Sequence, residues 1–169
     1  MLGDSHKVVN PFEWGEKGRL FEACLNVAEM RRLPAIAAGG EQRCCARIQF
    51  GKAGELVTAV GQVCAVLTVL CQRCLEPLQL DLRPAVHWGI VTSEAAAERL
   101  QAELEPVIVT GQRANLAEWV EDELILAMPV VPMHQPAECA VTLTTPAVPD
   151  VDHPFAVLKS LVKNKGPSR

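Results

Sequence analysis

The sequence predicts an α+β fold in which antiparallel β-hairpins form a sheet or partial barrel, with a few short helices and a flexible C-terminal tail. Three observations predict it. Apolar and polar residues alternate over 44–50 and again over 78–90, and a valine-rich run lies between these two segments. Turns rich in glycine or proline separate the three segments. A capped amphipathic helix pattern then follows, over 115–128.

The first part of the domain is expected to contain an extended segment, a short helix and a strand. Residues 19–24 are typical of an extended segment, and a short helix is expected to begin near Asn26. Pro34 limits that helix because proline cannot donate a backbone hydrogen bond inside it. After a break at Gly39 and Gly40, residues 44–50 alternate in the manner of a half-buried strand.

Two consecutive hairpins are expected next. A turn at 51–54, with glycine at both ends, should return the chain into a strand at 56–70, whose apolar residues on both faces suit a central strand covered on both sides. The turn at 71–77 leads into the alternating strand 78–90. Pro84 places that strand at an edge of the sheet or at a bulge.

The remaining elements are mostly helical. Residues 93–104 are rich in alanine and glutamate and predict an exposed helix capped by Ser93 or Thr92, and 106–109 suits a short strand. Asn115 and Glu118 have the spacing of a capping box, so a helix is expected over 116–128, before Pro129.

The chain is expected to hold one compact domain with extensions at both ends. A length of 169 residues, 49% of them hydrophobic, suits one core. The expected parts are an N-terminal tail at 1–17, a single α+β domain at 18–139, a proline-containing linker at 140–153 and a short amphipathic segment at 154–169. In that last segment Phe155, Leu158 and Val162 share one helical face, which suits either docking onto a partner or packing back on the domain.

Composition narrows the classes of function and the compartment. The net charge of −4 argues against a broad phosphate-binding surface, and the seven aromatic residues leave few platforms for stacking bases. Seven cysteines without an apolar signal region at the start favour reduced thiols in the cytoplasm. No run is long and apolar enough to predict a membrane span.

One set of residues has the types and spacing of a metal site. Cys71 and Cys74 are separated by two residues in a predicted turn, which lets two thiolates bind one tetrahedral zinc ion. His134 and Cys139 would supply the second pair of ligands to a single structural zinc. Two alternatives stay open: reduced thiols that simply pack near a turn, and a thiol-redox pair, although strands rather than a helix flank these cysteines.

No signature of catalysis stands out elsewhere in the sequence. The sequence holds no glycine-rich phosphate loop, nucleophile elbow or zinc-protease motif. The densest acidic run is Glu121, Asp122 and Glu123, but consecutive residues of a helix point about 100° apart and do not easily converge on one ion. These three carboxylates are therefore expected on a solvated face.

Three segments carry a resemblance to a known family. Residues 71–77, then 119–134 followed by Cys139, and the end piece 154–161 resemble the YceD family, the large ribosomal RNA subunit accumulation proteins of bacteria. Some relatives have more cysteines after the second segment, where this chain offers only His134 and Cys139.

The resemblance implies a cytoplasmic role in synthesis, processing or stability of 23S rRNA, with no enzymatic step. The expected partner is a ribosomal protein, an assembly factor or an rRNA-processing component, and whether the chain contacts rRNA directly stays open. The alternative is a thiol-redox or zinc-dependent protein that acts through Cys71 and Cys74.

Overall fold

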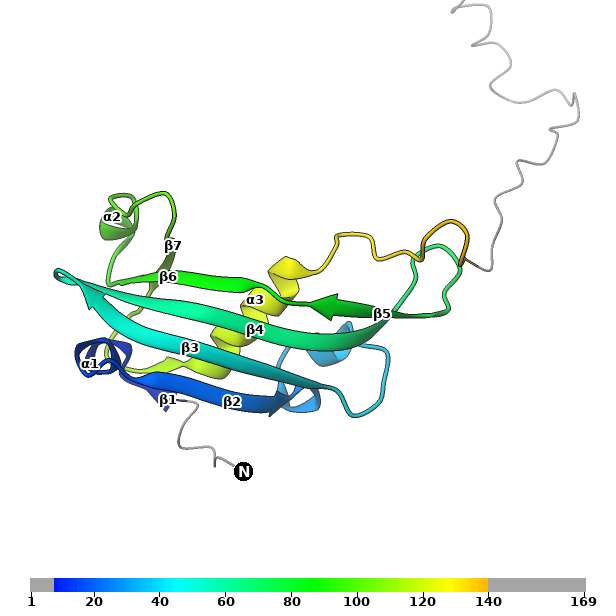
Figure 1. Ribbon diagram of the computed structural model, residues 1–169, viewed down its shortest axis with the longest axis horizontal. Coiled ribbons are helices and arrows are strands. Elements are labelled where there is room, and N and C mark those ends of the chain that lie inside the picture. The colour runs from blue at the N-terminus through cyan, green and yellow to red at the C-terminus, as the bar shows by residue number, and fades with distance from the viewer. Residues whose placement is uncertain (1–7, 140–169) are drawn as a thin grey trace, which may run out of the picture.

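The computed structural model describes residues 8–139 and confirms the α+β prediction. Its main element is an open six-stranded sheet with the order β2-β3-β4-β6-β7, in which β5 also pairs with β4 (Figure 1). The strands of this sheet are β2 (Leu20–Asn26), β3 (Arg43–Ala53), β4 (Leu56–Leu70), β5 (Pro77–Leu82), β6 (Ala85–Val91) and β7 (Glu105–Ile108). The other elements are β1 (Val8–Val9), α1 (Pro11–Glu16), the 3-10 turns η2 (Val27–Glu29) and η3 (Leu33–Ala35), α2 (Glu94–Ala97), β8 (Ala114–Asn115) and α3 (Leu116–Ala127).

The β3–β4 hairpin forms as predicted, but it turns later than the sequence suggested. Strand pairing continues until Ala53 lies opposite Leu56, so the turn consists of Gly54 and Glu55. Gly54 has a φ of 65°, which a residue with a side chain rarely adopts. Gly51, expected at the turn, lies instead inside the ladder.

Strand β4 is central in the sheet, but only one of its faces is covered. Alternate side chains of β4 point to one face and most of them are buried, whereas Val60 and Val66 on the other face are 46% and 52% exposed. The expectation of cover on both sides is therefore wrong for the residues that the structure describes. Gly61 marks a close approach of β3, since a Cβ there would lie 2.1 Å from the carbonyl oxygen of Arg47.

Strands β5 and β6 continue one antiparallel register against β4. Leu82 lies opposite Ala65 and Ala85 lies opposite Gln62, so no residue is inserted across the break between the two strands. Pro84 falls within that break and accepts a hydrogen bond from the amide of Val63. The expected edge or bulge is therefore not a bulge here: Pro84 lies in a short break between β5 and β6 without an inserted residue.

Beyond β6 the sheet departs from the purely antiparallel arrangement that was expected. Strand β7 pairs with β6 in parallel, and the connection between them carries the short helix α2. The side chain of Ser93 caps α2 as expected, but the helix covers only Glu94–Ala97 of the predicted range 93–104. A parallel neighbour requires a crossover connection, and the segment that carries α2 provides it.

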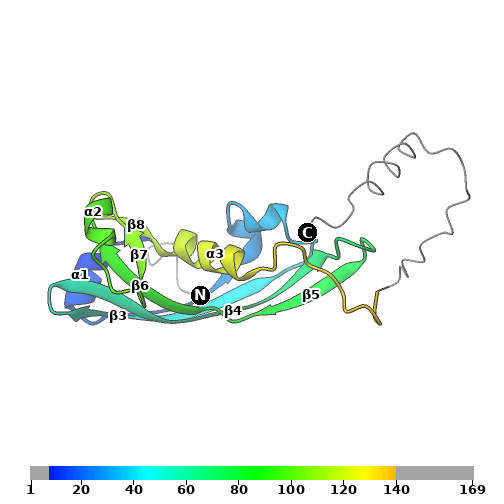
Figure 2. The ribbon, with the colours of Figure 1, turned by 90° about the horizontal axis from the view of Figure 1, so that it is seen from above.

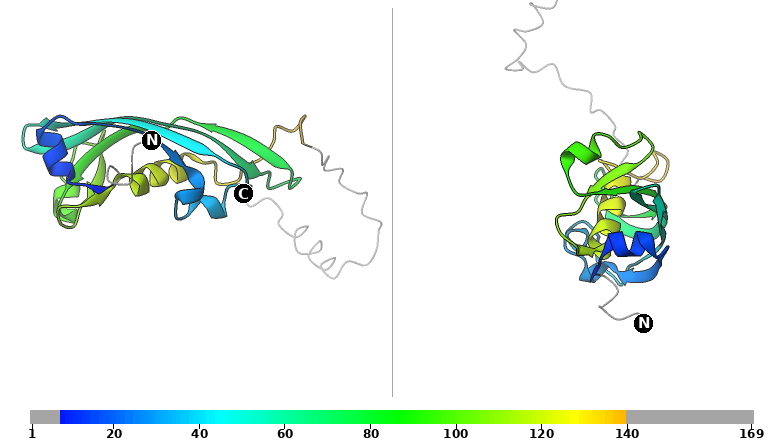
Figure 3. Two further views of the ribbon diagram at one scale, coloured as in Figure 1. Left: turned by 90° about the horizontal axis from the view of Figure 1, so that it is seen from below. Right: turned by 90° about the vertical axis from the view of Figure 1, so that its left-hand side faces the viewer.

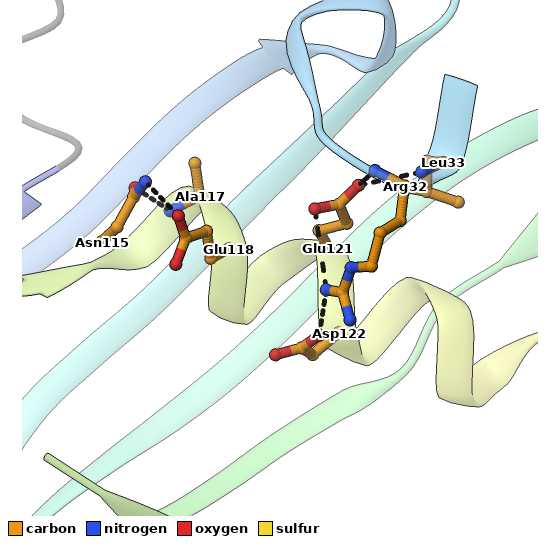
Figure 4. A network of polar contacts seen from close by, with 7 residues as sticks. All are labelled: Arg32, Leu33, Asn115, Ala117, Glu118, Glu121 and Asp122. Atoms are coloured by element: carbon orange, nitrogen blue, oxygen red, sulfur yellow. Dashed lines mark hydrogen bonds and ion pairs between the residues drawn. The ribbon is translucent and has the colours of Figure 1, made fainter. Parts of the chain in front are cut away.

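The described helices lie on one face of the sheet, as Figures 2 and 3 show from two sides. Helix α3 packs Leu116, Val120 and Leu124 against the buried side of the strands. Asn115 caps the helix, since its side-chain oxygen accepts a hydrogen bond from the amide of Ala117. Its side-chain nitrogen also donates a hydrogen bond to the carboxylate of Glu118 (Figure 4). The core therefore lies between α3, α1 and one face of the sheet.

Two carboxylates of the acidic run are buried, which corrects the expected solvated face. Glu121 is 2% exposed and accepts hydrogen bonds from the backbone amides of Arg32 and Leu33 at 2.6 and 2.9 Å (Figure 4). Glu123 is 7% exposed and accepts a hydrogen bond from the indole of Trp88. Burying a carboxylate is unfavourable unless hydrogen bonds compensate for the lost water. The hydrogen bonds of Glu121 supply this compensation and hold η3 against α3, and the hydrogen bond of Glu123 holds β6 against α3.

Regular structure begins before residue 18, where the domain was expected to start, since β1 and α1 lie within residues 8–17. Asn10 caps α1 by accepting from the amides of Phe12 and Glu13, and Trp14 packs edge-on against Phe50. The linker and C-terminal segment, with Phe155, Leu158 and Val162, lie outside the described residues. None of the helices within residues 8–139 has the length and apolar character needed to cross a bilayer.

Candidate metal centre

The turn between β4 and β5 brings two cysteines together at one end of the sheet. Cys71 directly follows β4, and its carbonyl accepts a hydrogen bond from the amide of Leu75 at 2.9 Å. Leu75 has a φ of 62°, so the chain reverses sharply after Cys74. The amide of Cys71 in turn donates to Glu76, which closes the loop. The two-residue spacing of the cysteines thus coincides with a tightly closed turn.

The segment after α3 lies beside this turn. Figure 1 shows the chain passing from α3 to the turn between β4 and β5. The amide of Gln72 donates to the carbonyl of Pro132 at 2.8 Å, and the guanidinium of Arg73 donates to the carbonyl of His134, also at 2.8 Å. The amide of Cys139 donates back to Gln135 at 3.2 Å, forming a second short turn. Two turns that are distant in sequence therefore face each other.

The four predicted ligands meet between these turns. The ligand atoms of Cys71, Cys74, His134 and Cys139 all lie within 4.8 Å of one another. Cys71 is fully buried and Cys139 is 9% exposed, whereas Cys74 and His134 are half-buried. Spacing alone suggested this grouping, and the structure brings together all four residues of the set.

Hydrogen bonds orient the imidazole of His134. Its Nε2 lies 3.1 Å from the carbonyl oxygen of Pro77, which can only accept, so Nε2 carries the proton. The other nitrogen, Nδ1, faces the Sγ of Cys74 at 3.3 Å. A histidine held this way by a backbone carbonyl presents an unprotonated nitrogen to a metal ion. The hydrogen bond to Cys74 also raises the pKa of His134 in the absence of an ion.

The surroundings of Cys71 favour its thiolate form. Burial raises the pKa of this thiol, but backbone amides of Cys74, His134 and Arg73 that point at its sulfur outweigh burial and lower the pKa to about 5. The amide of His134 lies 3.4 Å from that sulfur. Thiolate is the form of cysteine that binds metal ions.

This set of ligands could hold a metal ion, and its chemistry is that of a structural zinc site. Three thiolates and one imidazole match the tetrahedral sites in which the protein fills every position. A catalytic zinc needs one position for water or substrate, which four protein ligands do not leave. An ion here would tie the turn after β4 to the segment after α3, across 59 residues of sequence between Cys74 and His134.

The sequence also predicted partner-binding residues, and it did not reveal two contacts of His134. Phe155, Leu158 and Val162, expected to bind a partner, are outside the described range. Sequence reasoning missed that Arg73 and Pro77 contact His134. Arg73 lies inside the cysteine pair and Pro77 ends the same motif, but their types alone do not signal these contacts.

Comparisons with known proteins agree on one family. The family model described as "Large ribosomal RNA subunit accumulation protein YceD" matches residues 59–162, a stretch that contains all four candidate ligands. A curated relative of the same name, from Haemophilus influenzae, is 33% identical over 115 residues. That alignment covers 63% of this chain and 66% of the relative, just under two thirds of its length. No solved structure matches the chain. Because the family model matches more than half of the chain, the chain belongs to the YceD family.

Proposed function

We propose that this chain is a non-catalytic cytoplasmic factor that supports the synthesis, processing or stability of 23S rRNA. The observation that carries the proposal is the family match over residues 59–162, because it includes most of β4, all of α3 and both turns of the candidate metal centre. The curated relative is named for accumulation of the large ribosomal RNA subunit. Within this proposal the metal centre acts as a structural element.

The chemistry of the cluster supports a structural role for the metal. Four protein ligands satisfy a tetrahedral zinc ion, and the metal then contributes to folding rather than to bond breaking. The ion would fix residues 132–139 against the end of the sheet, where hydrogen bonds from Gln72 and Arg73 already hold them. We propose one zinc ion per chain, bound by Cys71, Cys74, His134 and Cys139.

The charge of the chain supports action through a protein partner. A net charge of −4 provides little of the attraction to phosphates on which sequence-independent RNA binding depends. The proposed partner is therefore a ribosomal protein, an assembly factor or an rRNA-processing component, and the 154–169 segment with Phe155, Leu158 and Val162 is the proposed docking element.

A depletion experiment tests the proposal. Cells that lose this chain should show a lowered ratio of 23S to 16S rRNA, and the wild-type gene should restore that ratio. Cys74→Ser, which removes a ligand, should restore it poorly. Gln72→Ala changes an exposed side chain in the same turn, keeps all four ligands and should restore it fully. An unchanged ratio after depletion would rule the proposed function out.

Affinity capture identifies the kind of partner. The full chain should retain ribosomal proteins or assembly factors after nuclease treatment of the lysate, if contact runs through protein. A variant carrying Phe155→Asp and Leu158→Asp should lose them, whereas Lys159→Asp, in the same segment, serves as the matched control. Retention that vanishes with nuclease would show instead that RNA bridges the contact.

One observation favours a second candidate function, a thiol-redox role for Cys71 and Cys74. The pKa of Cys71 is lowered to about 5, as in reactive thiols. Its side chain is nevertheless fully buried, while a redox cysteine must meet the disulfide of another molecule. Rapid alkylation of Cys71 in metal-loaded native protein would favour this alternative, and protection of Cys71 would favour the structural zinc.

A further inference from the structure

A second group of cysteines lies on the open face of the sheet, away from the candidate metal centre. In the β2–β3 register Cys24 lies directly opposite Cys45, and in the β3–β4 register Cys45 lies directly opposite Cys64. The three side chains therefore form one row across three adjacent strands. Cys24 and Cys45 are joined by a disulfide, and Cys64 is a free thiol.

The row is accessible from solvent. Cys24 and Cys45 are exposed and Cys64 is half-buried. All three line a broad hollow of about 1170 Å³ over β2, β3 and β4, and their side chains lie on the exposed face of the strands, opposite the buried face that packs on α3. Reactive cysteines are distinguished from inert structural ones by such partial exposure. The neighbouring Cys44 shows the contrast, since it is buried on the other face of β3.

The backbone pattern explains why the first pair can form a disulfide. The amide of Phe50 donates to Arg19, and the amide of Val27 donates to Gln42, which fixes the alternation of the β2–β3 ladder. By that alternation Cys24 and Cys45 occupy a non-hydrogen-bonded position, where side chains of opposing residues are closest. Their Cα atoms are 4.0 Å apart.

The third cysteine stands in line with this bond. Adjacent strands lie about 4.8 Å apart, so Cys64 is one strand from Cys45 and two strands from Cys24. A thiolate that displaces one sulfur of a disulfide attacks the nearer sulfur from the side opposite the leaving sulfur. Cys64 approaches Cys45 from the β4 side, and Cys24 lies on the far, β2 side.

A cationic group lies at the end of the row beside Cys64. The register from Leu82 opposite Ala65 to Ala85 opposite Gln62 has no insertion, so Arg83 falls opposite Cys64. The pKa of Arg83 is raised, first by its hydrogen bond and ion pair with Asp81 and then by the negative charge of the Cys64 thiolate. Arg83 therefore places a positive charge beside the Cys64 end of the row.

We propose that Cys24, Cys45 and Cys64 form a thiol–disulfide exchange site, in which Cys64 takes over Cys45 and releases Cys24. The thiolate of Cys64 forms a bond to the Sγ of Cys45, the Cys24–Cys45 bond breaks, and its electron pair leaves on Cys24. The number of disulfides is unchanged, so no external oxidant is consumed. The disulfide then joins β3 to β4 instead of β2 to β3, and the free thiol is that of Cys24, on the edge strand β2. This site is independent of the proposed role in rRNA accumulation.

Alkylation trapping tests the exchange in the full chain. Protein first oxidised with glutathione disulfide is exposed to iodoacetamide at pH 8, and peptides are mapped by mass spectrometry without reduction. Each release of Cys24 is captured by alkylation, so carbamidomethylated Cys24 and a Cys45–Cys64 disulfide should accumulate together. In Cys64→Ser the labelling of Cys24 should fall by at least about tenfold, because the attacking thiol is gone.

Two further variants make the result decisive. Cys44→Ala removes the adjacent buried thiol and should leave Cys24 labelling unchanged, whereas Cys24→Ser should form the Cys45–Cys64 disulfide directly on oxidation. The rate should not depend on protein concentration, since the attack is intramolecular. The proposal is overturned if Cys24–Cys45 stays intact while Cys64 is alkylated, if oxidised protein lacks that disulfide, or if Cys64→Ser labels at the wild-type rate.

Discussion

Two regions of this molecule use the same residue type for different purposes. At the end of the sheet, Cys71, Cys74 and Cys139 converge with His134 on a point between two turns. On the open face, Cys24, Cys45 and Cys64 stand in a straight row across paired strands. A converging set can surround one ion, whereas a row can only join neighbours in pairs.

Backbone geometry accounts for this difference. Tight turns direct successive amides toward one sulfur, and the amides around Cys71 outweigh the effect of burial and lower its pKa to about 5. Residues within a β-ladder have their amides paired with neighbouring strands, and on the open face of this sheet their side chains reach solvent. We therefore expect metal chelation to act on the first region alone, and reduction to act on the second.

Removal of the metal should have the largest effect on stability. With zinc at a thousand times its Kd, binding stabilises the folded state by about 4 kcal/mol. For a chain of this size, chelation should then lower Tm by about 8–16 °C. Thermal unfolding with and without EDTA measures this, and Cys64→Ser should show the same fall because it keeps all four ligands. An equal Tm in both conditions would contradict the zinc assignment.

The fold was predictable wherever local pattern decides it. In β3 and in β5–β6, the alternation of apolar and polar residues in the sequence predicts which side chains are buried. Asn115 likewise marks the start of α3 as its N-cap. The parallel pairing of β7 depends on a crossover that no local pattern reveals. The burial of Glu121 was also hidden, because its partners, the amides of Arg32 and Leu33, lie far away in sequence.

The two cysteine regions differed in how far sequence could reveal them. The two-residue spacing of Cys71 and Cys74 indicates a metal site because it reports a turn. The row of Cys24, Cys45 and Cys64 has no characteristic spacing, since it depends on the registers of two hairpins. With those registers, the expectation of uniformly reduced thiols gives way to a disulfide between Cys24 and Cys45.

Reduction of the cross-strand disulfide should have a smaller effect than chelation. The bond joins residues 21 apart in sequence, so loop entropy predicts a stabilisation of up to about 3 kcal/mol. Urea unfolding of zinc-loaded protein, with and without a reductant, measures the difference. Cys45→Ser cannot form either cross-link of the row, so reductant should leave its stability unchanged. A reductant effect of equal size in Cys45→Ser would place the sensitive bond elsewhere.

The smallest expected effects come from single substitutions at Cys44 and Cys64, which have the same residue type but lie on opposite faces of the sheet. Cys44 and Cys45 are adjacent, yet Cys44 faces the core and is fully buried. Burial raises the pKa of Cys44 to about 11, so at pH 8 it should resist iodoacetamide in the folded state, in contrast to the Cys24 thiol that exchange releases on the open face. Cys44→Ser buries a hydroxyl among apolar groups and should cost about 1–2 kcal/mol in urea unfolding. Cys64→Ser, on the open face, should change stability by less than about 0.5 kcal/mol. Equal costs for the two variants would mean that both faces of the sheet are covered, and the row would then have no access to solvent.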